Sequence, residues 1–124
     1  MDAVVTKSAR NKMLKARAGD LVLPKIKGMA FGDGGVDGDG SIIVPSVDQT
    51  ELHNELLRKE VSGHEYLNDT VCRYSCTLEA SELAGSISEL ALYDEDGDLI
   101  AIKNFSGKGK DDDLEMTFNI DDIF

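Results

Sequence analysis

The feature that most constrains this chain is an acidic turn between two apolar runs, residues 90–93 and 99–102. The turn contains Asp94, Asp96 and Gly97. Apolar runs that flank an Asp- and Gly-rich turn are typical of a β-hairpin, because glycine supplies the positive φ that the chain reversal needs. We therefore expect these three residues to have a structural role in a hairpin turn.

Two other segments have the pattern of amphipathic helices. Residues 8–18 begin at Ser8, which can cap a helix, and continue with apolar residues at helical spacing. Residues 48–60 begin with a capping-box sequence and carry Leu52 and Leu56 four positions apart. The sequence therefore predicts two helices.

The remaining segments are predicted to be mainly strand. Residues 21–31 alternate loosely around Pro24 and suit an edge strand, where proline costs no ladder hydrogen bond. Four later strands are expected, at residues 70–78, 86–93, 99–105 and 114–120. The expected fold is a single α+β domain spanning residues 1–124, with two helices packed on a largely antiparallel β-meander. The residues expected in its core are Leu52, Leu56, Leu90, Leu92, Ile100, Ile102 and Phe118.

Charge is distributed unevenly along the chain. Twenty-four acidic and thirteen basic residues give a formal net charge of −11, which disfavours nucleic acid and anionic membranes as partners. The helix expected at residues 8–18 is nevertheless basic, and it precedes an acidic body, residues 21–124. Opposite charges on head and body suit contacts between neighbouring subunits. The basic residues expected to make such contacts are Lys7, Arg10, Lys12, Lys15 and Arg17.

A glycine-rich loop follows the first expected strand. Residues 32–40 contain five glycines and three aspartates, and so offer too few apolar groups to pack. We expect this loop to be mobile, with Asp33, Gly34 and Gly35 available for contacts with other proteins.

The acidic hairpin turn and the glycine-rich loop, two acidic segments, also suggest a calcium site, because hard cations are bound by several carboxylate oxygens. Their spacing does not fit an EF-hand. The twelfth position, where a bidentate Glu is required, is Val44 in a loop counted from Asp33 and Phe105 in one counted from Asp94. We expect no metal, cofactor or catalytic residues, and no enzymatic activity.

Cys72 and Cys76 lie in a segment rich in strand-forming residues. Four strand residues span about 13 Å, which exceeds the roughly 7 Å limit between disulfide-bonded α-carbons. We therefore expect two free, half-buried thiols. The N-terminus does not have the pattern of a signal peptide, and apolar runs are much shorter than the roughly 20 residues of a membrane helix.

Three motifs occur in a recognisable order. An apolar strand runs into the glycine-rich loop at residues 26–35, a Thr-x-Leu-x-Asn-Glu sequence occupies residues 50–55, and the Asp-Glu-Asp-Gly hairpin turn follows at residues 94–97. Together they resemble the N-terminal attachment domain of bacteriophage tail-collar and tail-fibre proteins.

The resemblance implies a structural component of a phage or prophage-derived tail that attaches or adapts a tail fibre to the baseplate. It implies other tail or baseplate proteins as partners and a homo-oligomer, trimeric in the assembled particle. Such a protein would be made in the cytoplasm of the bacterial host and assembled into a virion tail or tail-like particle. The alternative hypothesis is a small cytosolic cation-binding or regulatory domain that uses its acidic, glycine-rich turns.

Overall fold

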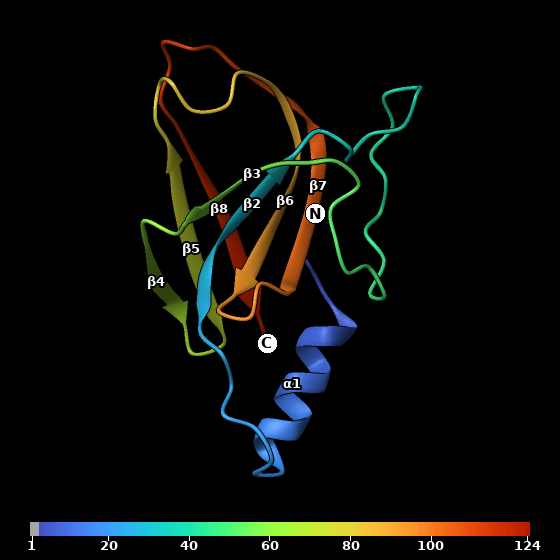
Figure 1. Ribbon diagram of the computed structural model, residues 1–124, viewed down its shortest axis with the longest axis vertical. Helices are drawn as coiled ribbons and strands as arrows, with labels where there is room; N and C mark the ends of the chain where they lie inside the picture. Colours follow the sequence, from blue (N-terminus) through green and yellow to red (C-terminus); the bar gives the residue numbers. More distant parts are fainter. Residues whose placement is uncertain (1–2) are drawn as a thin grey trace.

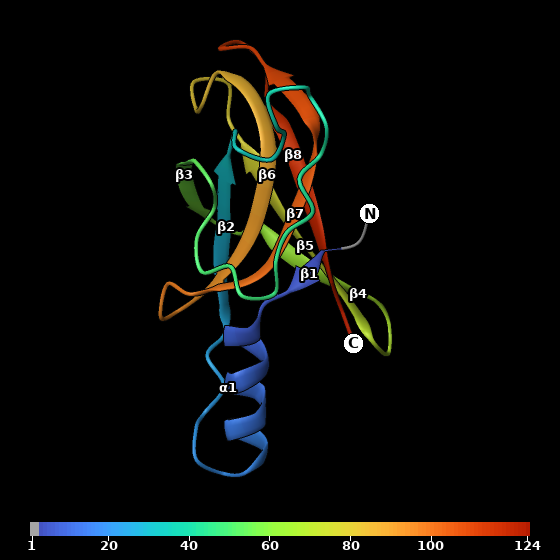
Figure 2. The same ribbon diagram turned by 90° about the vertical axis from the view of Figure 1, so that its right-hand side faces the viewer.

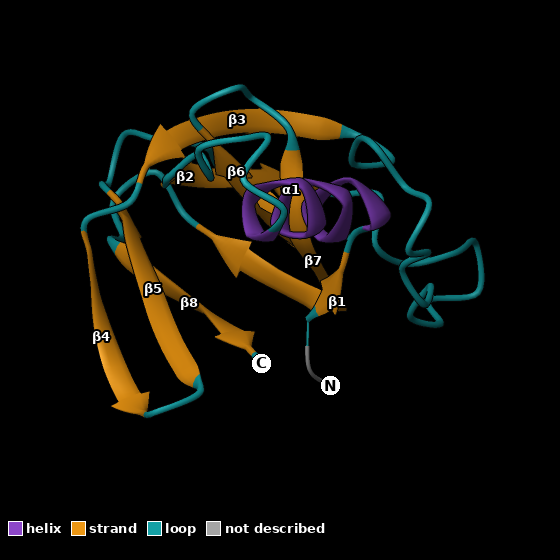
Figure 3. Ribbon diagram, turned by 90° about the horizontal axis from the view of Figure 1, so that it is seen from below, coloured by secondary structure: helices purple, strands orange, loops and turns teal. Residues whose placement is uncertain are grey.

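Two antiparallel β-sheets pack against each other in the structure, a computed structural model that describes residues 3–124 (Figure 1). The first sheet has the strand order β1-β7-β6-β2-β3, and the second has the order β4-β5-β8. The helix α1 extends below the strands (Figure 2), and the view from below separates the two sheets (Figure 3). In chain order the elements are β1 (Val4–Val5), α1 (Lys7–Arg17), β2 (Ile26–Gly32), β3 (Glu55–Glu60), β4 (Gly63–Asn68), β5 (Val71–Leu78), β6 (Gly85–Asp94), β7 (Leu99–Lys110) and β8 (Met116–Ile123).

The expected α+β fold, with two helices packed on a meander, is therefore wrong. The described residues form one short helix, and strands in two antiparallel sheets make up the rest of the regular structure. This is a mostly β fold.

The strands β2, β6 and β7 are buried on both faces of the first sheet. On one face, Met29, Phe31, Leu90 and Leu92 belong to the core between the sheets, where the rings of Phe31 and Phe118 meet edge to face at 5.3 Å. On the other face, a second buried cluster consists of Ala30, Leu52, Ala91, Tyr93, Leu99 and Ile102. Burial of both faces explains why these strands read as continuous apolar runs instead of alternating ones.

The helix predicted at residues 48–60 is the main error of local structure. Residues 55–60 form β3, which pairs with β2 and gives that strand a second hydrogen-bonded neighbour. Leu52 is buried in the preceding loop, but Leu56 is 43% exposed and lies outside the core. The pairing of residues 55–60 with β2 therefore outweighs the local signals for a helix, which are the capping box and the spacing of Leu52 and Leu56.

Three smaller corrections concern the boundaries and positions of elements. The cap of α1 is Thr6, not Ser8. The strand expected at residues 21–31 begins at Ile26 and lies between β3 and β6, so it is an interior strand. The strand β4 was not predicted, because all six of its residues are exposed and leave no alternating pattern.

Other expectations are confirmed. The β6–β7 pair is the predicted hairpin, and Gly97 has the positive φ (86°) expected of its turn. Phe118 and Ile120 in β8 are buried, while Thr117 and Asn119, which alternate with them, are exposed. Both cysteines are free, and Cys72 is half-buried as expected, whereas Cys76 is fully buried.

Candidate interaction surface

The acidic turn of the β6–β7 hairpin binds a lysine from α1. The Nζ atom of Lys12 lies 2.6 Å from Asp94 Oδ2, 3.1 Å from Asp96 Oδ2 and 2.8 Å from Asp98 Oδ2. The side chain of Lys12 is only 13% exposed, and that of Asp94 is fully buried. Burial alone would lower the pKa of Lys12, but the hydrogen bonds to the carboxylates outweigh it and raise the pKa above its ordinary value. Lys12 thus stays charged and joins the helix to the hairpin.

The same turn is where three carboxylates could hold a metal ion. The ammonium group of Lys12 already supplies positive charge to all three of them. This arrangement argues against a cation site at the turn. Hydrogen bonds within the turn join its residues: Asp94 Oδ1 accepts from the N–H groups of Asp96 and Asp98, and the Gly97 N–H donates to the Asp94 carbonyl.

Thr6 provides a second attachment of α1 to the hairpin. Its hydroxyl donates to the Leu99 carbonyl at 2.7 Å and accepts from the N–H of Ala9, which caps the helix. Its own N–H donates to the carbonyl of Ile100. Because Thr6 is fully buried, these bonds are shielded from water and fix the start of α1 on β7.

The five basic residues predicted as an interaction surface therefore differ in position. Lys12 is bound internally, and Lys7 lies 3.9 Å from Asp48 in an exposed ion pair, a type that contributes little to stability. Arg10, Lys15 and Arg17 are exposed, and no salt bridge found in residues 3–124 includes them. Three cationic groups of the helix are thus available to another molecule.

The base of the glycine-rich loop is held by a buried carboxylate on β6. The side chain of Glu89 accepts hydrogen bonds from the N–H groups of Gly34, His53 and Asn54, all at 2.8–2.9 Å. Glu89 is completely buried. Since Gly34 is the second residue of the β2–β3 loop and Asn54 is its last, one carboxylate ties both ends of the loop to the sheet.

The glycines allow this close approach of backbone to sheet. A Cβ on Gly34 would lie 2.6 Å from the Cβ of His53, and a Cβ on Gly35 would overlap the Ser88 carbonyl. The N–H of Gly35 donates to the hydroxyl of Ser88, and Asp33 accepts from the side chain of Asn54. Asp33, Gly34 and Gly35 therefore make contacts within the chain, and their role in binding other proteins stays a prediction.

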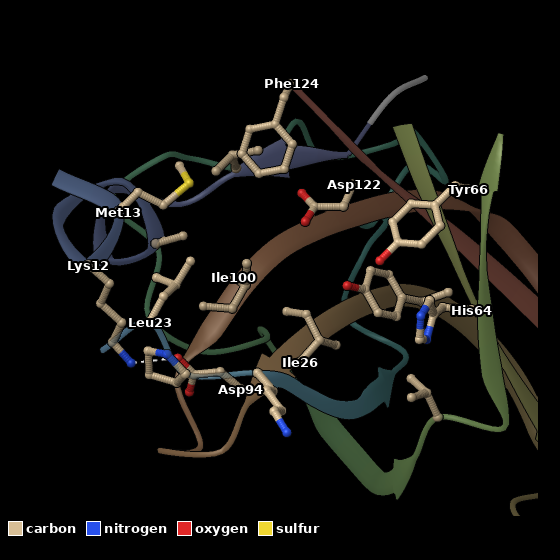
Figure 4. Close-up of a pocket in the computed structure, with 16 residues that line it drawn as sticks. Lys12, Met13, Leu23, Ile26, His64, Tyr66, Asp94, Ile100, Asp122 and Phe124 are labelled. Atoms are coloured by element: carbon tan, nitrogen blue, oxygen red, sulfur yellow. Dashed lines mark hydrogen bonds and ion pairs between the residues drawn. The ribbon is translucent and has the colours of Figure 1, made fainter. Parts of the chain in front are cut away.

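A cavity of about 470 Å³ lies between α1, the end of the first sheet and the inner side of the second (Figure 4). Apolar side chains that include Ile26 and Ile100 line it, and Asp122 of β8 points its carboxylate into it (Figure 4). Asp122 is 8% exposed, and its Oδ1 accepts no hydrogen bond from the described residues. Burial raises the pKa of this carboxyl group.

Aromatic residues form the side of the cavity that belongs to the second sheet. The ring of His64 lies 5.7 Å from the rings of both Tyr66 and Tyr74. Burial is the larger cause that raises the pKa of Tyr74, and the nearby Cys72 raises it further. The phenol of Tyr74 therefore stays neutral. The cavity therefore combines apolar walls, aromatic faces and one carboxylate with an oxygen that no described residue bonds to.

Comparison with known proteins identifies the family of this chain. The model of the N-terminal region of phage tail-collar fibre proteins matches residues 1–119. The chain belongs to this family. No curated protein and no solved structure matches this tail-collar fibre domain. Within residues 3–124, none of its helical structure has the length and apolar character of a membrane span.

Two buried carboxylates of the candidate surface were not predicted from the sequence of the tail-collar fibre domain. Glu89 is a charged residue within the apolar run of β6. A carboxylate in such a run indicates a buried side chain that needs hydrogen-bond donors from the same chain, here from the β2–β3 loop. Asp122 carries no comparable signal, because it is one of many acidic residues near the C-terminus. Only the packing of β8 against the other strands shows that its side chain is buried.

Proposed function

We propose that this domain is an attachment module that joins or adapts a tail fibre to the baseplate of a phage or prophage-derived tail. Membership of the tail-collar fibre family supports a structural role in a tail. The module would act by surface complementarity, without enzymatic turnover, and its partners would be other tail proteins and further copies of the chain.

The observation that carries this proposal is the geometry of α1. The helix extends from the body (Figure 2), yet the Lys12 and Thr6 contacts fix its orientation. It presents Arg10, Lys15 and Arg17 to solvent on a chain whose net charge is −11. A rigid basic projection on an acidic body suits docking onto an acidic protein surface.

Incorporation into tails tests the proposal. Particles assembled with the wild-type chain should retain it through density-gradient purification. The variant Arg10→Glu/Lys15→Glu should be incorporated less, because charge reversal opposes docking on an acidic surface. The matched control Lys27→Glu/Lys108→Glu makes the same change in net charge at two exposed lysines outside α1 and should be incorporated normally.

Circular dichroism should show that both double variants are folded. If purified particles do not contain the wild-type chain, the proposed role is wrong. If the two double variants are incorporated equally, α1 is not the attachment surface.

A further inference from the structure

The exposed face of α1 combines positive charge with an apolar group. Arg10, Leu14 and Arg17 are spaced i, i+4 and i+7, which places them on one side of a helix. Leu14 is 66% exposed. The adjoining face of α1 carries Ala9 and Met13, which line the cavity of the same chain. This outer stripe is therefore without a partner in the structure described.

The cavity has the complementary features. Its mouth includes Leu23 and Phe124, two apolar side chains that are 50% and 69% exposed. Within it, the buried carboxylate of Asp122 has an oxygen that accepts no hydrogen bond from residues 3–124. A buried carboxylate is costly without a partner, whereas an arginine could supply a charge-assisted hydrogen bond.

We propose that the cavity of one copy receives side chains from α1 of a second copy. Leu14 of the second copy would pack on the apolar mouth, and Arg10 or Arg17 would donate to Asp122. The volume of about 470 Å³ admits individual side chains while the helix itself stays at the mouth. This inference rests on the proposed tail function and names one contact through which copies would assemble there.

Charge favours a second copy as the occupant. Copies with a net charge of −11 repel each other over most of their surface, so the basic helix is the part that can approach an acidic body. The helix stripe and the cavity are also both present on every copy of the chain, so copies can bind one another. A helix-to-cavity contact joins two different surfaces, and such contacts build rings or continuous arrays.

Sedimentation velocity of the isolated domain tests the proposal, with two kinds of variant. Asp122→Asn removes the acceptor charge but leaves α1 intact. Arg10→Glu/Arg17→Glu disables the helix stripe but leaves the cavity intact. The wild-type chain should self-associate as its concentration rises, and each variant alone should be monomeric. An equal mixture should form dimers and nothing larger, because only one working helix and one working cavity can meet.

One control and one further variant make the result specific. Asp39→Asn makes the same charge change as Asp122→Asn on an exposed loop residue and should leave self-association unchanged. Phe124→Ser alters the mouth through a side chain that is already 69% exposed, so it should weaken association without unfolding the domain. Circular dichroism on each variant checks the fold.

A wild-type chain that stays monomeric at every concentration would overturn the proposal. So would self-association that Asp122→Asn leaves unchanged. If the chain is monomeric but Asp122→Asn reduces its incorporation into tails, a different tail protein occupies the cavity. In that case the second-copy contact is wrong while the tail function stands.

Discussion

The ammonium group of Lys12 lies 2.6 Å from the fully buried carboxylate of Asp94, across 82 positions of sequence. This pair connects the only helix described to the hairpin that the sequence predicts most clearly. It also explains why the acidic turn tolerates three aspartates at close range.

Replacing Lys12 should destabilise the domain. In Lys12→Met the carboxylate of Asp94 stays buried without its cation, which should cost about 1–3 kcal/mol of unfolding free energy. Urea denaturation monitored by circular dichroism measures the change. Lys15→Met, at an exposed position of the same helix, should change stability by less than about 0.5 kcal/mol. Equal effects of the two substitutions would show that the Lys12 contact adds nothing to stability.

Glu89→Gln should loosen the ends of the β2–β3 loop. The substitution replaces one acceptor oxygen with an NH₂ group that faces backbone N–H donors, so at least one hydrogen bond is lost, at a cost of about 1–3 kcal/mol. Hydrogen exchange should accelerate at the amides of Gly34, His53 and Asn54, which donate to Glu89 in the wild type. Glu115→Gln, at an exposed position beside β8, is the control and should leave these amides protected.

Gly35→Ala should be poorly tolerated. The added Cβ would overlap the carbonyl of Ser88 on β6, and forced overpacking of this kind costs about 1–3 kcal/mol. The loop control is Gly38→Ala, whose added Cβ would meet no heavy atom within 4 Å. Thermal unfolding should therefore show a lower midpoint for the first variant and little change for the second. A wild-type midpoint for Gly35→Ala would contradict the close approach of loop and sheet.

The adjacent residues Asp121 and Asp122 should respond to pH in opposite ways. The hydrogen bond from Arg73 lowers the pKa of Asp121, so its carboxylate stabilises the fold above the unfolded-state pKa, and this contribution is lost as pH falls through the lowered value. Burial raises the pKa of Asp122, so its charge opposes folding at neutral pH. That penalty disappears as pH falls through the raised pKa to the unfolded value.

Urea denaturation across pH 3–7 at dilute concentration can separate these two effects. At pH 7, Asp121→Asn should be less stable than the wild type and Asp122→Asn at least as stable. Both differences should shrink toward pH 3, where the unfolded carboxyl groups, with a pKa of about 3.9, are mostly protonated. A loss of stability in Asp122→Asn at pH 7 would mean that its carboxylate is stabilised within the chain.

Local patterns predicted the parts of the fold that local residues determine. The hairpin turn with Gly97, the strands β5 to β8 and the first helix were each visible in short segments. The segment at residues 48–60 was not, because its structure depends on pairing with β2 and on hydrogen bonds to Glu89, 35 positions away. An exposed edge strand such as β4 leaves no burial pattern to detect.

The candidate surface shows the same limit. The sequence identified the basic helix but could not distinguish Lys12, which is bound to the hairpin, from Arg10, which is exposed. That distinction depends on how α1 is oriented, and Thr6 and β7 set the orientation. The cavity around Asp122 depends on the packing of two sheets and a helix, which short sequence patterns do not contain.

Three attachments of the N-terminal segment converge on one hairpin. The strand β1 pairs with β7, Thr6 bonds to the same strand, and Lys12 binds the turn that joins β6 to β7. A pulling force applied to α1 would be transmitted to the first sheet through this hairpin. The hydrogen bonds between β6 and β7 would then share the load. The mechanical strength of the domain under tension should therefore depend on the β6–β7 hairpin more than on the glycine-rich loop or the second sheet.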